Sequence, residues 1–264
     1  MIDIWKCVNY LQPIFLLKST IIYEYDIEKA NISVLLDNGL ISKDYYDWLY
    51  KQDRMVRQVI IGKMEKENRA ITKAKQHGIE EAKRQLFQAN TILNAEVLSI
   101  KNDAVFVTRE LTNLEFKHVK FTLRNVYTMF MKVFRCELYY LYDITTEEEK
   151  LDIKGINDDV LYLQKDYLVD FLKELFCTYQ VDGVIETISL LQRFYRQYMS
   201  RSLPLEYYRD INTGNFLLDT GSTMYEYYSD IPNDKIRSIV NISNNGSFLR
   251  EIAKILFMDY ASES

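Results

Sequence analysis

The chain has 264 residues, of which 48% are hydrophobic and 14% aromatic, so it has enough apolar material for one large domain or two smaller ones. Only 8 Gly and 3 Pro are present, which excludes collagen-like and linker-like sequences and favours long helices. A formal net charge of −5 argues against a protein that coats nucleic acid through bulk charge, although basic residues outnumber acidic ones between residues 51 and 84.

The cysteines and the N-terminal residues indicate a cellular compartment. Cys7, Cys136 and Cys177 are widely spaced among apolar neighbours, and we expect buried free thiols. The first residues lack the pattern of a secretion signal, and no apolar run approaches the roughly 18 residues that span a bilayer. The sequence therefore predicts a cytoplasmic protein without a membrane partner, in a host cytoplasm if the gene is viral.

The N-terminal third is predicted to contain one strand followed by helices. Residues 20–25 are β-branched or aromatic, which is typical of a strand, and this strand ends at Asp26. A short helix follows. Apolar residues then recur at helical spacing through residues 43–94, and we expect Gly62 and Gly78 to break this stretch into separate helices.

A β-hairpin and further strands are predicted next. Residues 95–107 contain two apolar runs around a short polar turn, which predicts a hairpin with Asp103 at or just past its tip. Further strands are expected at residues 116–121 and 136–142, where apolar and aromatic residues lack helical spacing. Residues 147–150 are charged and are predicted to form a solvated turn.

The C-terminal half is predicted to be mostly helical. Helices are expected at residues 160–179, 184–198 and 248–259, around a polar, Tyr-rich region at 204–245. The expected fold class is α+β, with a first region at residues 1–142 and a helical region at 143–264.

Carboxylates are the side chains that offer chemistry in this chain. The sequence has no HExxH, P-loop, GxGxxG or GxSxG motif, and its two histidines give little basis for a zinc site or a Ser-His-Asp triad. Asp26 and Asp103 follow predicted strands, and two such carboxylates can hold a pair of divalent cations for phosphoryl transfer. Taken singly, Asp26 could cap the next helix and Asp103 could be an ordinary turn residue.

Two segments resemble motifs of family B DNA polymerases. Residues 25–33, Tyr-Asp-Ile-Glu-Lys-Ala-Asn-Ile-Ser, look like motif A, with its invariant acid at Asp26. Residues 99–107, Ser-Ile-Lys-Asn-Asp-Ala-Val-Phe-Val, look like motif C, with its second acid at Asp103. The order of the motifs and the basic helical stretch between them also agree. Lys101 stands where motif C has its first acid, and the fingers signature is absent.

The resemblance implies a polymerase-like palm with a small antiparallel sheet in residues 1–142, a helical fingers-like insertion at about 43–94 and a helical thumb-like region at 143–264. It implies template-directed nucleotidyl transfer in DNA replication, with a DNA or RNA template as partner. It also implies that Asp26 and Asp103 are catalytic ligands of Mg²⁺ or Mn²⁺, and that Ile27, Glu28, Lys29 and Asn31 contact the incoming nucleotide. Independently of the resemblance, Lys66, Arg69 and Lys73 lie three and four positions apart, so on a helix they would form one face that binds phosphates of the triphosphate or the template.

Two other interpretations stay open at this point. The first is a polymerase-derived protein of a virus or phage that has lost catalysis and serves as a nucleic-acid-binding, scaffold or structural protein, with a protein partner supplying the missing functions. The second is an unrelated helical interaction protein. Lys66, Arg69 and Lys73 would then form only a solvated helix face beside Glu65 and Glu67.

Overall fold

The computed structural model describes residues 14–143, 145–146, 148–217, 223–224 and 239–263. It confirms a mixed α and β fold with an antiparallel sheet. The strands are β1 (Ile14–Ile27), β2 (Val97–Ile100), β3 (Ala104–Val107), β4 (Glu115–Phe116), β5 (Val119–Val133), β6 (Cys136–Asp143), β7 (Glu148–Lys154), β8 (Phe216–Leu217) and β9 (Thr223–Met224). The helices are α2 (Ala30–Asp37), α3 (Lys43–Lys51), α4 (Arg54–Glu67), α5 (Arg69–Ala89), α6 (Asp158–Leu163), α7 (Asp170–Asp182), α8 (Val184–Met199) and α10 (Ile239–Glu263), with short helical turns at Asn94–Glu96, Lys165–Val169 and Leu205–Tyr208.

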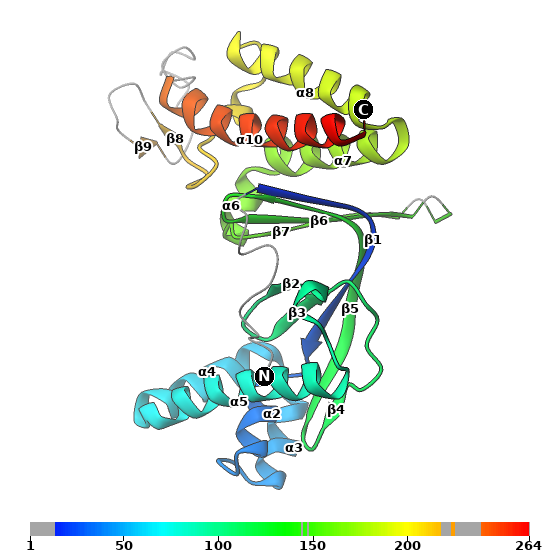
Figure 1. The fold of residues 1–264 in the computed structure, drawn as a ribbon. Coiled ribbons are helices and arrows are strands. Elements are labelled where there is room, and N and C mark those ends of the chain that lie inside the picture. The colour runs from blue at the N-terminus through cyan, green and yellow to red at the C-terminus, as the bar shows by residue number, and fades with distance from the viewer. Residues whose placement is uncertain (1–13, 144, 147, 218–222, 225–238, 264) are drawn as a thin grey trace. The chain divides into compact units, whose positions relative to one another are not determined.

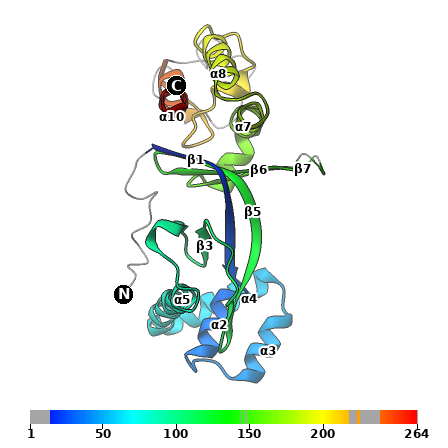
Figure 2. The same cartoon turned by 45° about the vertical axis from the view of Figure 1, so that its right-hand side comes forward.

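The chain divides into two compact units. Among the described residues, the first contains residues 20–126, and the second contains residues 14–19 and those from 127 onward. The long strands β1 and β5, which run side by side in Figure 2, contribute residues to both units. The second unit thus includes β6 and the end of β5, which the division at residue 142 had assigned to the first region.

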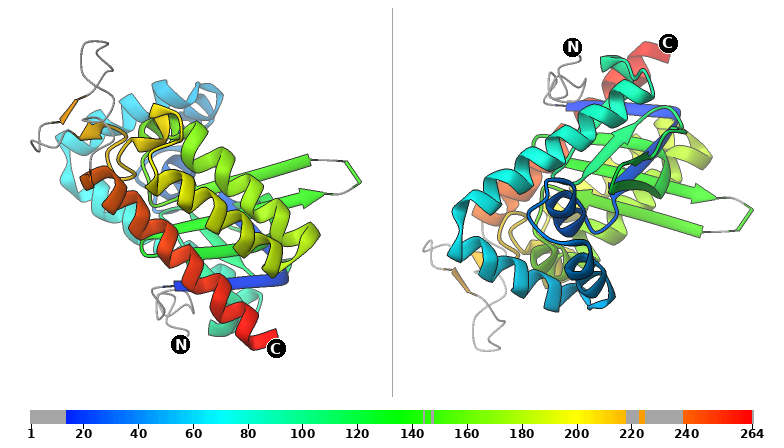
Figure 3. Two further views of the ribbon diagram at one scale, coloured as in Figure 1. Left: turned by 90° about the horizontal axis from the view of Figure 1, so that it is seen from above. Right: turned by 90° about the horizontal axis from the view of Figure 1, so that it is seen from below.

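One seven-stranded sheet has the strand order β2-β3-β1-β5-β6-β7, and β4 pairs with β5. In the first unit, helices cover the part of this sheet that contains β2, β3, β1 and β5. Helices α2 and α5 supply Val34, Ile79 and Leu86 to an apolar core shared with Tyr25 and Val105 of the strands. Figure 3 shows α5 next to α4 in this unit. Burial of such side chains contributes about 1.5–3 kcal/mol each, so this core fixes the strands that end at the candidate carboxylates.

In the second unit, α7, α8 and α10 pack together, and the sheet contains β5, β6 and β7 (Figure 1). Alternate strand residues such as Met131, Leu138 and Tyr140 face helix residues such as Phe176 and Leu191 in one apolar core. Cys136 is a buried free thiol and Cys177 a partly buried one, while Cys7 lies outside the described residues. No helix in the described part of the chain is long and apolar enough to cross a membrane.

The predicted breaks at the two glycines were wrong. Gly62 lies within α4 and Gly78 within α5. The helices are instead separated near Asp53 and Asn68, whose side chains accept hydrogen bonds from the first turns of α4 and α5. A Cβ on Gly78 would lie 2.9 Å from the Cβ of Val34, so this glycine allows α5 to approach α2 closely.

Other element boundaries also differ from the predictions. Residues 147–150 were expected to be a turn, but β7 begins at Glu148 and pairs with β6. The single strand predicted at 116–121 is interrupted by a tight turn at residues 117–118, so that Phe116 ends β4 and residues 119–121 begin the much longer β5. The helix predicted at 160–179 is divided into α6, a π-helical turn and α7. The side chains of β7 are mostly half-exposed, so this strand tolerates charged residues. Its sequence therefore lacks the apolar pattern that predicts a strand.

Candidate functional site

Antiparallel pairing of β1 with β3 brings Asp26 and Asp103 to one place. Asp26 is opposite Ala104 in the register, and the backbone N–H of Ile27 donates to the carbonyl of Asp103 at 3.0 Å. Both aspartates line one cavity of about 300 Å³, which we call the aspartate cavity. Its other lining residues are Ile27, Lys29, Ala30, Asn31, Ile32, Arg54, Arg57, Gln58, Ile61 and Arg124.

The Asp26 carboxylate has one oxygen in an ion pair and one without a partner. Arg124 of β5 places Nη1 3.0 Å from Asp26 Oδ2. Oδ1 is buried and accepts no hydrogen bond from the described residues. Burial and the nearby charge of Asp103 raise the pKa of Asp26, and Arg124 opposes this rise. A further cation at Oδ1 would therefore stabilise the ionised form.

Neither aspartate serves the purely structural role that each could have had alone. Helix α2 has no side-chain cap, because Lys29, in the left-handed region at φ 48°, precedes it and Asp26 does not reach its first turn. The Asp103 carboxylate accepts no hydrogen bond within the described part of the chain, although its backbone carbonyl does. Both carboxylates are thus available to a ligand in the cavity.

A basic wall formed by α4 lies on the same cavity. Arg54, Arg57 and Gln58 line the cavity three and four positions apart, which places them on one helix face. The Arg57 guanidinium also donates to the carbonyl of Gln52, just before α4. Sequence reasoning missed these side chains, although their helical spacing beside Asp53 was visible in the sequence.

The turn after β1 is tied to α3 and brings another cation to the cavity. Lys29 Nζ donates to the carbonyl of Tyr50 at 2.9 Å, and the Tyr50 hydroxyl donates to the Glu28 carboxylate. Burial lowers the pKa of Lys29, as does the neighbouring Arg57. Of the residues predicted to contact a nucleotide, Ile27, Lys29 and Asn31 line the aspartate cavity, whereas Glu28 is bound to Tyr50.

Lys83 of α5 supports the tip of the β2–β3 hairpin. Its side chain is only 2% exposed, and Nζ donates to the carbonyls of Lys101 and Asn102, both at 3.1 Å. Burial lowers the pKa of Lys83, and the charge of Asp103 opposes this effect. A buried ammonium thus holds the turn that presents Asp103.

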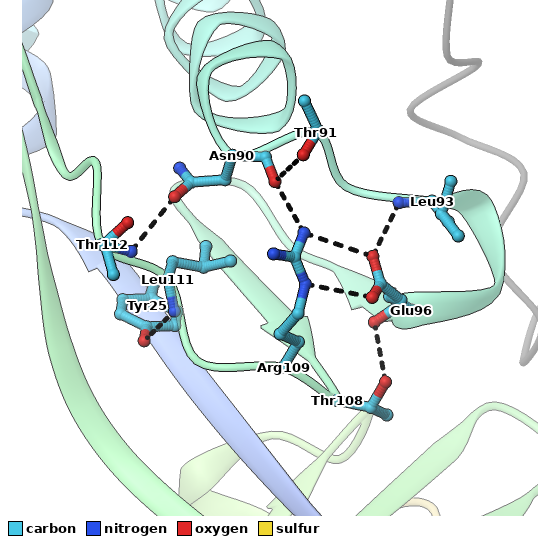
Figure 4. A network of polar contacts seen from close by, with 9 residues as sticks. All are labelled: Tyr25, Asn90, Thr91, Leu93, Glu96, Thr108, Arg109, Leu111 and Thr112. Carbon is cyan, nitrogen blue, oxygen red and sulfur yellow. Dashed lines mark hydrogen bonds and ion pairs between the residues drawn. The ribbon is translucent and has the colours of Figure 1, made fainter.

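A second polar network holds the base of the same hairpin (Figure 4). Arg109 Nε lies 3.0 Å from Glu96 Oε1, and the same carboxylate accepts from the backbone N–H of Leu93. Buried Asn90 donates to the carbonyls of Leu86 and Asn113 and accepts from the N–H groups of Thr112 and Asn113. The hairpin is therefore anchored to α5 at both of its ends.

The structure does not bring Lys66, Arg69 and Lys73 into the aspartate cavity. These exposed residues line a separate concavity of about 680 Å³ with Gly62, Glu65 and Thr72. Glu65 is paired with Lys75, and no ion pair involves the three cations within the described residues. They form a basic surface on α4 and α5 that is distinct from the acidic cavity, and we call it the basic surface.

The donor set of the cavity fits a divalent cation such as Mg²⁺ or Mn²⁺. Asp26 and Asp103 offer hard carboxylate oxygens, and the buried Oδ1 of Asp26 has no hydrogen-bond partner among the described residues. No group of three or more His, Cys, Asp or Glu side chains suited to a metal occurs in the described chain. Glu24 accepts from Asn125, and Glu96 pairs with Arg109, so these nearby acids have structural partners.

Comparison with known proteins gives a family match over nearly the whole chain. The model of the family described as "Bacteriophage PBS1 gene 130 protein" matches residues 1–258. No curated protein matches.

Proposed function

We propose that this chain, which belongs to the Bacteriophage PBS1 gene 130 protein family, is a divergent, minimal nucleic-acid polymerase that adds nucleotides under the direction of a template. One observation carries the proposal: Asp26 of β1 and Asp103, in the turn just before the adjacent strand β3, share a cavity with the basic face of α4. An acidic wall facing cationic side chains suits a cation-bound nucleoside triphosphate. The resemblance of the two aspartate segments to motifs A and C supports the same function.

In the proposed reaction, the cationic and the acidic residues of the aspartate cavity have different roles. Arg54, Arg57 and Lys29 bind the triphosphate, and guanidinium groups suit this role because they can form paired hydrogen bonds with phosphate oxygens. Asp26 and Asp103 would hold a divalent cation, which would supply charge neutralisation and lower the pKa of the attacking hydroxyl. The hydroxyl oxygen of the growing strand bonds to the α-phosphorus, its proton passes to solvent, and pyrophosphate leaves as the α–β bond breaks.

The basic surface is assigned to the template strand. Lys66, Arg69 and Lys73 are outside the aspartate cavity, so they are available to backbone phosphates rather than to the triphosphate. Each phosphate contact releases counterions, and binding should therefore weaken as salt rises. Replacing all three by Ala should reduce the affinity for single-stranded DNA or RNA in a filter-binding assay. Lys43, Lys117 and Lys120, each already paired with an acid, form the matched triple-Ala control.

Primer extension tests the proposed reaction. The wild type should extend a labelled primer with Mg²⁺ or Mn²⁺. Deoxyribonucleotides and ribonucleotides should both be tried. Asp26→Asn and Asp103→Asn should each abolish extension, because amides bind hard cations poorly. Asp47→Asn, whose wild-type side chain is paired with Lys43 outside the cavity, should stay active. Equal activity of Asp103→Asn and the wild type would refute the site.

A second candidate function is an inactive, polymerase-derived phage scaffold or nucleic-acid-binding protein. The Asp26–Arg124 ion pair favours it, because a carboxylate already neutralised in this way has less need of a metal. This function predicts no extension with any template. It also predicts no rise in melting temperature with Mg²⁺ or Mn²⁺, since a ligand that does not bind the native state cannot stabilise it.

A further inference from the structure

We infer that the aspartate cavity holds a single divalent cation, between Asp26 Oδ1 and the Asp103 carboxylate, and that the Arg124 guanidinium supplies the second positive charge of the site. The inference rests on the proposed function, since it takes Asp26 and Asp103 to be cation ligands. It departs from the pair of cations that two such carboxylates can hold in phosphoryl transfer.

The distribution of oxygen donors supports a single ion. A pair of ions about 4 Å apart needs carboxylate oxygens for both. Asp26 Oδ2 is already 3.0 Å from Arg124 Nη1, which leaves Oδ1 and the Asp103 carboxylate. Glu24, the neighbouring acid on β1, is bound to Asn125.

The position of Arg124 supports its role as the second positive charge of the site. Strand β5 neighbours β1, so Arg124 is fixed beside Asp26 by the sheet, across 98 positions of sequence. A guanidinium cannot lose its proton in a protein, so its charge is constant. A second divalent cation near Asp26 Oδ2 would meet this permanent charge and would have to displace it.

Titration of the full-length protein with Mn²⁺ alone, followed by electron paramagnetic resonance, tests the stoichiometry without requiring activity. The wild type should bind one ion that both Asp26→Asn and Asp103→Asn eliminate. Arg124→Glu replaces the positive charge of the guanidinium by a third carboxylate. The number of bound Mn²⁺ ions should then rise to two, with the exchange-coupled signal of adjacent ions. Lys120→Glu makes the same charge change on the same strand, where Lys120 is paired with Glu115, and should leave the number at one.

The outcomes separate this inference from the proposed function. Two ions in the wild type, or a single ion in Arg124→Glu, would overturn the inference and leave the polymerase proposal standing. Absence of any Asp26-dependent ion would overturn both. If Arg124→Glu fails to fold by circular dichroism, Arg124→Gln replaces it, and its affinity for the single ion should rise about two- to fivefold, the factor typical of an exposed ion pair. An unchanged affinity would contradict the role of Arg124.

Discussion

The two ends of the β2–β3 hairpin use buried polar groups in opposite ways. At the base, the Glu96 carboxylate is shared between Arg109 and a backbone N–H, and Asn90 uses both its donor and its acceptor atoms. At the tip, Asp26 keeps a buried oxygen without a partner, and the Asp103 carboxylate accepts no hydrogen bond in the described residues. Glu96 and Asn90 at the base are bound within the protein and contribute stability, whereas the carboxylates at the tip are open to a ligand.

The largest effect is expected at the base. Asn90→Ala removes the partners of several backbone groups at a residue that is 6% exposed, so the free energy of unfolding should fall by about 3 kcal/mol. Urea denaturation followed by circular dichroism measures this change. Asn113→Ala is the matched control, because the wild-type side chain is exposed and makes one hydrogen bond, to Ala89. Equal losses in the two variants would contradict the distinction between the ends.

Lys83→Met tests the support of the tip. The carbonyls of Lys101 and Asn102 lose their donor, and we expect the free energy of unfolding to fall by about 2 kcal/mol. Arg84→Met, at a partly exposed neighbour, should leave the free energy of unfolding unchanged. A loss of the same size in Arg84→Met would contradict the role of Lys83 in holding the turn.

A smaller loss is expected at Tyr25, which joins the core to the segment after β3. The backbone N–H of Leu111 donates to the Tyr25 hydroxyl at 2.9 Å, as Figure 4 shows. Tyr25→Phe leaves this N–H without its acceptor, so the free energy of unfolding should fall by about 1 kcal/mol in urea denaturation. Tyr23→Phe, on the same strand, should cost less. The reverse order would show that the hydroxyl of Tyr25 adds nothing.

The smallest effect, of opposite sign, is expected for Asp26→Asn without metal. The pKa of Asp26 is raised, so above the ordinary value of 3.8 the native state binds more protons than the unfolded state. Wild-type stability should therefore fall as the pH rises from 3.8 through the raised pKa. Asp26→Asn removes this slope and should be slightly more stable than the wild type at pH 7, and the difference should vanish below pH 3.8. Denaturation across this pH range tests the prediction, and a loss at pH 7 would contradict it.

Local sequence signals identified much of the hairpin and both carboxylates. Apolar runs around a polar turn predicted β2 and β3, and β-branched residues predicted the part of β1 that ends near Asp26. These signals succeed because strand propensity and turn chemistry depend on neighbouring residues. The placement of Asp103 beside Asp26 followed only from the motif resemblance, because the pairing of strands is not a local property.

The rest of the site depends on contacts between distant residues. Arg124 lies 98 positions from Asp26, and nothing in its own neighbourhood indicates that β5 will bring it there. Local spacing indicated the basic residues Lys66, Arg69 and Lys73, yet Arg54 and Arg57, in the first turn of α4, line the cavity instead. The low helix propensity of Gly78 predicts a helix break, but its close approach to Val34 in α2 is a contact between distant residues, which local propensity does not indicate.

The passage of β1 and β5 through both units affects how the gene can recombine. Every residue that lines the aspartate cavity lies in one uninterrupted stretch of the first unit, Thr20–Val126, whereas the second unit needs residues from both sides of that stretch. Exchange of residues 20–126 as a block between related phages would bring in a complete new cavity. A single crossover between Asp26 and Arg124 would instead join carboxylate and guanidinium from different parents, and only compatible parents would yield a paired site.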